Sequence, residues 1–343
     1  MDKIIFTQDK LNELILSNDY SSAVRLLLRE QIKSWPDLEK SYTSYKTSQT
    51  KTFNFDNFII KVQNNPGRLV SSSANVDKKT IETRACFLCV SNLFSKQKAI
   101  KHEDFLLLVN PFPIFPEHYT IPHKDHIPQT IKEWFGKMLL LSKDLSRDVV
   151  IYNGPACGAS APDHLHFQAG TKFFMPVDDG FNSVKNKYGE LIFEKESLSV
   201  TGIDDGLRKF IAIETDNIPS AEKVFNVFYN IYSKVSIEKA EPMMNIISFY
   251  EPHDQNSSNP DWRVLIFLRE KHRPSHYFRE DESRILLSPA AVDFGGVCIL
   301  PLEKDYEKIT QENIIEIFRE VSIGKEQFEY IKADLEKSLA TDS

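Results

Sequence analysis

One order of predicted secondary structure occurs twice along the chain, and this repeat limits the folds that it can adopt. Each copy runs strand, helix, strand, loop, strand, as judged from apolar runs, helical spacing and turn residues. The predicted elements lie at 118–121, 128–145, 149–152 and 164–168 in the first copy and at 210–213, 219–235, 245–250 and 264–268 in the second. A repeated unit of mixed strands and helices predicts an α+β protein that arose by duplication.

The rest of the chain is divided around this repeat. Apolar residues at three- and four-residue spacing, such as Leu11, Ile15 and Leu26, predict one or two helices in residues 1–50. The aromatic and β-branched stretch 52–63 predicts one strand, which ends at the turn-forming residues 64–67. We therefore expect a helical segment over 1–50, a first half over 51–180 and a second half over 181–343.

Composition and charge exclude several classes of protein. No apolar run approaches the roughly 20 residues that span a membrane, and residues 1–6 lack the features of a signal peptide. A net charge of −7 argues against non-specific binding to nucleic acid. Four cysteines in 343 residues do not make a disulfide framework. A cytoplasmic protein that binds neither membranes nor nucleic acid is expected.

The densest polar motif lies between Asn153 and Gln168. On a strand, His164, His166 and Gln168 would share one face, because side chains alternate with a period of two. The preceding loop contains Gly158 and Ser160 and can offer backbone N–H groups to phosphate oxygens. A His-x-His pair alone is usually structural. Combined with the glutamine and this loop, it favours a catalytic site.

Two cysteines and two groups of cations are the other polar features. Cys86 and Cys89 have the Cys-x-x-Cys spacing of a metal pair or a redox pair, although two buried thiols would also fit. Arg68 follows a turn, and Arg269 begins a basic cluster directly after an apolar strand. Each arginine is either solvated or a phosphate ligand. An acidic protein that handles phosphates must concentrate its positive charge locally, and we expect it at these two places.

The motif His164-x-His166-x-Gln168 resembles that of the histidine-triad superfamily. The similarity is to the branch that contains galactose-1-phosphate uridylyltransferase, diadenosine tetraphosphate phosphorylase and the plant GDP-galactose phosphorylases. Hydrolase branches carry a third histidine instead of the glutamine. Residues 112–126 also resemble the strand–loop–strand of the superfamily. The resemblance implies two fused halves, each with an antiparallel sheet and covering helices, and only the first keeps its histidines because 264–268 contains none.

The resemblance implies a role for each residue of the motif. His166 would attack the α-phosphorus of a nucleotide, and Gln168 would donate a hydrogen bond to a phosphoryl oxygen. Ser160 would hold the leaving phosphate, together with the loop amides around Gly158, and Asn153 would contact the substrate. Glutamine cannot act as a general acid, which favours transfer to a second phosphate over hydrolysis.

The resemblance also implies a structural zinc ion. The corresponding ligands are Cys86, Cys89, His126 and His164, a closed Cys₂His₂ set, with His118 and His123 as alternatives to His126. Arg68 resembles the arginine of a Gln/Asn-Gly-Arg segment in the plant phosphorylases.

The expected activity is nucleotidyl transfer through a covalent nucleotidyl-histidine. The donor would be a nucleoside diphosphate sugar or a dinucleotide polyphosphate, and the acceptor phosphate or a sugar 1-phosphate. The alternatives are a nucleotide hydrolase and a zinc-stabilised nucleotide-binding module without turnover. Base, sugar, pathway and oligomeric state stay open, although a homodimer would suit the superfamily.

Overall fold

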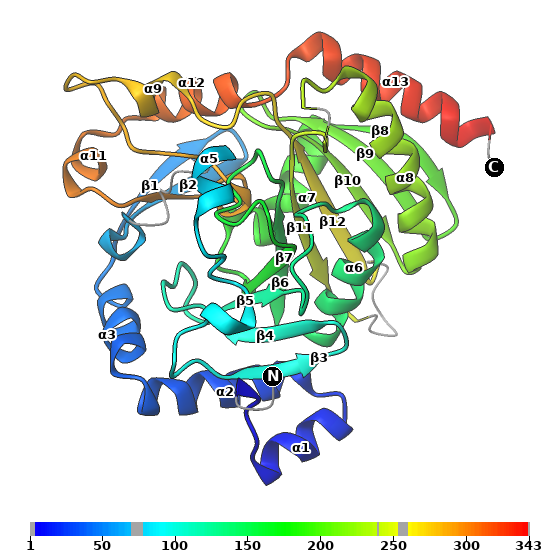
Figure 1. Ribbon diagram of the computed structural model, residues 1–343. Helices are drawn as coiled ribbons and strands as arrows, with labels where there is room; N and C mark the ends of the chain where they lie inside the picture. Colours follow the sequence, from blue (N-terminus) through cyan, green and yellow to red (C-terminus); the bar gives the residue numbers. More distant parts are fainter. Residues whose placement is uncertain (1–3, 70–77, 239, 253–259, 342–343) are drawn as a thin grey trace.

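A single antiparallel sheet of ten strands forms the centre of the molecule (Figure 1). The computed structural model describes residues 4–69, 78–238, 240–252 and 260–341. The strand order is β3-β4-β5-β7-β6-β11-β12-β10-β9-β8. The first five strands in sequence are β3 (Ala99–His102), β4 (Phe105–Val109), β5 (His118–Pro122), β6 (Asp148–Asn153) and β7 (His166–Thr171). The next five are β8 (Gly189–Lys195), β9 (Leu198–Asp204), β10 (Lys209–Thr215), β11 (Met244–Tyr250) and β12 (Trp262–Leu268).

The sheet has an internal two-fold pattern. Read outward from the central pair β6–β11, each side presents the fourth, fifth, third, second and first strand of its half. A long helix precedes the fourth strand in both halves, α6 (Phe135–Asp144) in the first and α8 (Ile218–Val235) in the second. The predicted α+β class and the repeated halves are thus confirmed. The halves share one sheet, and the boundaries at residues 50 and 180 stay a prediction.

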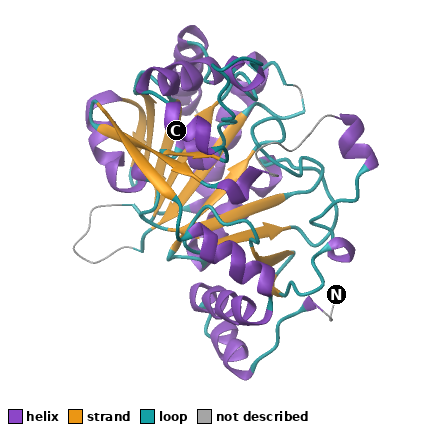
Figure 2. Ribbon diagram, turned by 90° about the vertical axis from the view of Figure 1, so that its left-hand side faces the viewer, coloured by secondary structure: helices purple, strands orange, loops and turns teal. Residues whose placement is uncertain are grey.

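Apolar cores lie on both faces of the sheet, and helices cover it on each side (Figure 2). Alternate residues of β6 divide between them: Val150 and Tyr152 join one core, Val149 and Ile151 the other. On the first face the rings of Phe135 and Phe225 stack 3.9 Å apart and tie α6 to α8. The second face carries the site described below.

The stretch 52–63, which we expected to be one strand, is a hairpin. β1 (Gln49–Phe55) and β2 (Phe58–Asn64) pair around a turn at Asp56 and Asn57, where Asn57 has φ 65°. Asparagine tolerates this left-handed conformation. β13 (Val297–Leu300) adds to β2 in parallel and completes a separate three-stranded sheet. This sheet brings the C-terminal part of the chain against Arg68.

Three α-helices lie before the hairpin in the described residues, where one or two helices were expected: α1 (Asp9–Leu16), α2 (Tyr20–Ser34) and α3 (Pro36–Tyr45). The helix predicted at 128–145 begins only at Phe135, after the short helix η4 (Lys132–Trp134). Other helices in the part of the chain that the structure describes are η2 (Pro66–Arg68), α5 (Lys78–Thr83), η3 (Val90–Asn92), α7 (Pro176–Tyr188), α9 (Ser275–Phe278), α10 (Ala291–Phe294), α11 (Glu303–Lys308), α12 (Gln311–Val321) and α13 (Lys325–Thr341). Within the described residues, none of the helices has the length and apolar character needed to cross a membrane.

Candidate active site and metal centre

A cavity of about 550 Å³ lies on the second face of the sheet, between the two halves of the chain. This volume is within the range of small-ligand pockets. The lining includes five of the residues predicted for catalysis or substrate binding in the first half, and Arg68 beside them. The second half contributes His272, Arg273, Ser288 and Asp293. The cavity therefore brings together polar groups that are far apart in the sequence.

His166 is buried at the start of β7, with its ring fixed by the backbone. Nδ1 lies 2.8 Å from the carbonyl oxygen of His164. A carbonyl can only accept, so Nδ1 carries the hydrogen and Nε2 keeps its lone pair. Burial lowers the pKa of His166 to about 4, which keeps the ring neutral. This is the tautomer and charge state of an imidazole nucleophile.

Gln129 holds the backbone around His166. The β6–β7 pairing ends at Ile151 and Gln168, and beyond it the side chain of Gln129 bridges the two strands. Its Oε1 accepts from His166 N at 2.7 Å, and its Nε2 donates to the carbonyl oxygens of His166 and Asn153 at 3.1 and 2.9 Å. One buried side chain thus replaces the missing ladder hydrogen bonds.

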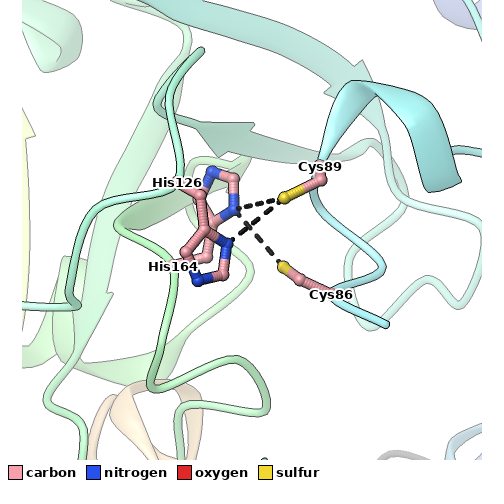
Figure 3. Close-up of side chains that lie close together, drawn as sticks. All are labelled: Cys86, Cys89, His126 and His164. Carbon is pink, nitrogen blue, oxygen red and sulfur yellow. Dashed lines mark hydrogen bonds between the residues drawn. The ribbon is translucent and has the colours of Figure 1, made fainter. Parts of the chain in front are cut away.

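Gln168 lines the cavity with His166, but His164 does not. We expected all three on one strand face. The strand begins only at His166, and His164 lies in the preceding turn, where its N–H donates to Ala161 O at 3.1 Å. The ring of His164 points instead to the two cysteines (Figure 3). The expectation of three adjacent polar groups is therefore wrong, and the two histidines serve different sites.

Asn153 and the loop after it are anchored by the second half. Asn153 Oδ1 accepts from Asn245 Nδ2 and from Ala291 N, both at 2.8 Å. The amide N–H groups are then the part of Asn153 that can donate to a ligand. Gly158 has φ +95°, and a Cβ there would lie 2.7 Å from the Cβ of Ala290. The loop needs glycine at this position for both its conformation and its packing.

Arg68 and Arg84 bring positive charge to the cavity wall. Arg68 donates to the carbonyl oxygen of Phe112 at 2.9 Å, and burial lowers its pKa to about 10, so it stays a cation at neutral pH. Arg84 donates through Nη2 to Ser160 O and to Asp163 Oδ1, each at 3.0 Å. It thereby ties the loop of Ser160 to the cysteine segment.

Arg269 does not line the cavity, and the expectation that it contacts substrate does not fit its geometry. The side chain is buried, and its five N–H groups donate to the oxygens of Asn245, Pro289, Lys271, His272 and Val321. A guanidinium used in this way has no donor left for phosphate. Arg273 of the same cluster does line the cavity, and it lies 4.2 Å from the centre of the Tyr277 ring.

The four predicted metal ligands converge on one point (Figure 3). One donor atom from each of Cys86, Cys89, His126 and His164 lies within 4.8 Å of all the others. Cys86 Sγ is 3.3 Å from His164 Nδ1, and Cys89 Sγ is 3.2 Å from His126 Nδ1. Two thiols and two imidazoles form a set that suits a tetrahedral metal.

The surroundings of the cluster support metal binding. His164 Nε2 donates to the carbonyl oxygen of His123 at 2.8 Å, which leaves Nδ1 without a hydrogen and directed at the thiols. His126 is the histidine that completes this group of four donor atoms. His123 packs its ring against Phe105 and Trp134, and the ring of His118 faces Gln168. These last two are therefore not ligands.

Sequence reasoning missed the roles of four residues that shape the site: Arg84, His118, Gln129 and Asn245. All four lie outside the motif, in loops or on other strands, and act through hydrogen bonds that no periodicity reveals. For Arg84 the sequence does contain a signal. It lies two residues before Cys86, so a metal site formed by Cys86 and His164 would bring it close to the loop that precedes His164.

Two stretches of the chain are similar to known protein families. Residues 27–171 match a family described as a domain of unknown function (DUF4922), and residues 246–341 match the GDPGP1-like C-terminal domain. No curated protein sequence matches the chain at a significant level.

Among solved structures, yeast Ap4A phosphorylase Apa2 in complex with AMP aligns with TM-score 0.53 and 13% identity, over 87% of this chain and 96% of that one. A second structure of yeast Apa2 aligns with TM-score 0.51 and 14% identity, over 89% and 98%. A uridylyltransferase structure has TM-score 0.41 and 11% identity, over 75% and 93%.

The alignment to Ap4A phosphorylase, which covers most of the chain, shows a common fold, and residues 246–341 are similar to the GDPGP1-like C-terminal domain. Both findings agree with the His-x-His-x-Gln motif. The expected resemblance is confirmed at this level: the chain shares the fold of Ap4A phosphorylase, and its C-terminal part matches the GDPGP1-like C-terminal domain.

Proposed function

We propose that the protein is a nucleotidyltransferase in which His166 is the covalent nucleophile. The observation that carries this proposal is the state of His166: a neutral ring, its Nδ1–H held by His164 O and its Nε2 lone pair available, in a cavity shared with Gln168. A nucleoside diphosphate sugar or a dinucleotide polyphosphate is the donor. The likeness to Ap4A phosphorylase supports a phosphorylase or transferase of this kind.

The reaction proceeds in two displacements. His166 Nε2 attacks the α-phosphorus, a P–N bond forms and the bond to the bridging oxygen breaks, so the distal phosphate leaves as an anion. The positive charge on the ring is stabilised by the hydrogen bond from Nδ1 to His164 O, 2.8 Å long. An acceptor phosphate oxygen then attacks the same phosphorus, the P–N bond breaks and the ring returns to its neutral form.

Four groups bind the phosphates in this scheme. Gln168 and Asn153 donate from their side-chain amides to non-bridging oxygens, and Ser160 and the backbone at Gly158 bind the leaving phosphate. All four line the cavity. Their donors are neutral amides and hydroxyls. No group in this set can protonate a leaving oxygen as a general acid does, which suits a phosphate leaving group that departs as an anion.

We propose that the acceptor is also anionic. The second-half wall holds Arg273 and His272, and Arg68 lies in the same lining. Burial, followed by the charges of Arg273 and Arg269, lowers the pKa of His272 to about 4, so the cations of this wall are the arginines. Inorganic phosphate or a sugar 1-phosphate fits this environment better than water does.

Exposed aromatic side chains also line the cavity and suit the base of the donor. Phe87, Phe94 and Phe112 line it and are 44%, 51% and 37% exposed, high values for phenylalanine. Phe87 also lies under the guanidinium of Arg84, at 5.0 Å. Exposed aromatic rings beside a phosphate site are suited to stacking on a nucleobase.

The test is a product assay with matched acceptors. Purified protein is incubated with a panel of nucleoside diphosphate sugars and diadenosine polyphosphates, with phosphate, with a sugar 1-phosphate or with neither. We expect consumption of a donor only when an acceptor is present. Equal release of mononucleotide without acceptor would favour the hydrolase. Binding of a nucleotide without consumption under any condition would favour the nucleotide-binding module.

We also propose that the Cys₂His₂ cluster holds a structural zinc ion. A closed four-ligand set leaves no position for a substrate, so the metal would hold the cysteine segment and the turn before His166 together. Metal analysis of Cys86→Ser and His126→Asn tests this, with the buried Cys157→Ser as a matched control. Loss of zinc in the first two variants and not in the third is expected. Undiminished zinc in both ligand variants would disprove the ligand set.

A further inference from the structure

Gln168 can donate a hydrogen bond to a phosphoryl oxygen only if its amide nitrogen faces the cavity. The amide group has two orientations of nearly equal shape, so some neighbour must select one of them. We propose that His118 is a positioning residue that fixes the amide of Gln168 for catalysis; this inference rests on the proposed function. His118 itself does not line the cavity.

Strand pairing places the two residues on one face. Thr120 pairs with Gln168 and His118 with Gly170, so the side chains of His118 and Gln168 project from the same side of the sheet on neighbouring strands. His118 Nε2 lies 3.0 Å from Gln168 Oε1. The contact is a diagonal cross-strand pair, held at its backbone by the β5–β7 ladder.

The tautomer of His118 follows from its other nitrogen. Nδ1 lies 3.2 Å from the backbone nitrogen of Ile114. A backbone N–H can only donate, so Nδ1 accepts and carries no hydrogen. In the neutral ring the hydrogen is then on Nε2, which donates to the oxygen of Gln168. A reversed Gln168 amide would place its N–H₂ group against this N–H, with no acceptor between them.

Packing holds the ring of His118 in this position. The ring is fully buried, and the ring of Phe115 covers it with 5.3 Å between centroids. Gly170 makes room for Phe115, since a Cβ on Gly170 would lie 2.2 Å from Phe115 Cγ. Burial, with the nearby charge of Arg68, lowers the pKa of His118 to about 3. His118 therefore stays neutral through the physiological pH range.

The consequence is a directed series of hydrogen bonds from the β4–β5 loop to the cavity. Ile114 N–H donates to His118 Nδ1, and His118 Nε2–H donates to Gln168 Oε1. Gln168 Nε2 is left to donate to the phosphoryl oxygen on which charge develops. Removing one such preorganised donor typically lowers rates about 100- to 1000-fold.

The test compares His118→Phe with Gln168→Ala and with the double variant. We expect His118→Phe to lower the single-turnover rate of adduct formation at saturating donor by about 10- to 100-fold, with donor affinity changed less than about 3-fold. The double variant should be no slower than Gln168→Ala alone. His118→Gln, which keeps a donor near the position of Nε2, should recover part of the rate. Additive losses, or an effect on affinity alone, would overturn the proposal.

Two further measurements keep the test independent of folding and of turnover. Tyr42→Phe removes a hydrogen bond to the backbone oxygen of His118 (3.2 Å) and should leave the rate near that of the wild type. In ¹⁵N-histidine-labelled wild-type protein, NMR should report an unprotonated Nδ1 and a protonated Nε2 for His118. The opposite tautomer would overturn the inference. If the wild type forms no adduct, the proposed function fails, and this NMR result still decides whether His118 donates to Gln168.

Discussion

Glu241 provides a prediction whose size can be worked out from the structure. Its side chain is 1% exposed and carries two hydrogen bonds, from Tyr152 Oη and from Ile131 N, each 2.6 Å long. Burial raises its pKa from the ordinary 4.5 to about 7. Because the pKa is higher in the folded state, the stabilisation is fully present below pH 4.5 and is lost as the pH rises through 7. The difference between the two pKa values corresponds to about 3 kcal/mol in the free energy of unfolding.

Glu241→Gln removes this titration and keeps the shape. The amide oxygen can accept from Ile131 N, and the amide nitrogen can donate to Tyr152 Oη. We expect the free energy of unfolding of the variant, relative to that of the wild type, to rise by about 3 kcal/mol as the pH is raised from 5 to 8. The assay is urea unfolding at a series of pH values, with the difference between the two proteins taken at each pH. Asp148 and Asp293, whose pKa values burial raises to about 6, cancel in this difference. A difference that does not change with pH would refute the reasoning.

Three further predictions concern packing and hydrogen bonding around the site. Gly170→Ala should cost about 1–3 kcal/mol, measured as a shift in the urea midpoint, because its Cβ meets the ring of Phe115 at 2.2 Å. Gln129→Leu loses three buried hydrogen bonds, so we expect a loss of about 3 kcal/mol and, in a single-turnover assay, a slower reaction of His166. Arg269→Lys supplies at most three donors to five acceptors and should cost at least about 2 kcal/mol in thermal unfolding, without changing the affinity for phosphate.

The sequence predicted the repeat of elements because that repeat is a local property. Apolar runs mark β6 and β11 to within one residue of their observed bounds. Turns were harder to predict from the sequence. Asp56 and Asn57 interrupt an otherwise continuous strand pattern, and two residues were too weak a signal to separate β1 from β2. A helix was expected from Pro128, yet residues 128–131 form no helix, and the side chain of Gln129 joins two strands instead.

The residues of the candidate site that belong to a sequence motif could be predicted. His166, Gln168 and the four predicted metal ligands were all named from the sequence. His166 and Gln168 line the cavity together, and the four predicted ligands lie together in the Cys/His group, which includes His164. The cations were harder to assign. Arg269 and Arg273 look equivalent in sequence. The N–H groups of Arg269 donate to buried oxygens, whereas Arg273 lines the cavity. Such a distinction depends on long-range packing, which residue type and spacing do not encode.

The central claim, covalent transfer through His166, is tested most directly by mass spectrometry of the protein itself. The wild type is mixed with donor in the absence of acceptor, and the adduct is located by peptide mapping. We predict the added mass of one nucleoside monophosphate on the peptide containing His166, its loss when phosphate or a sugar 1-phosphate is added, and no adduct in a folded His166→Ala variant. Donor turnover without any adduct, with His166→Ala still active, would contradict the account.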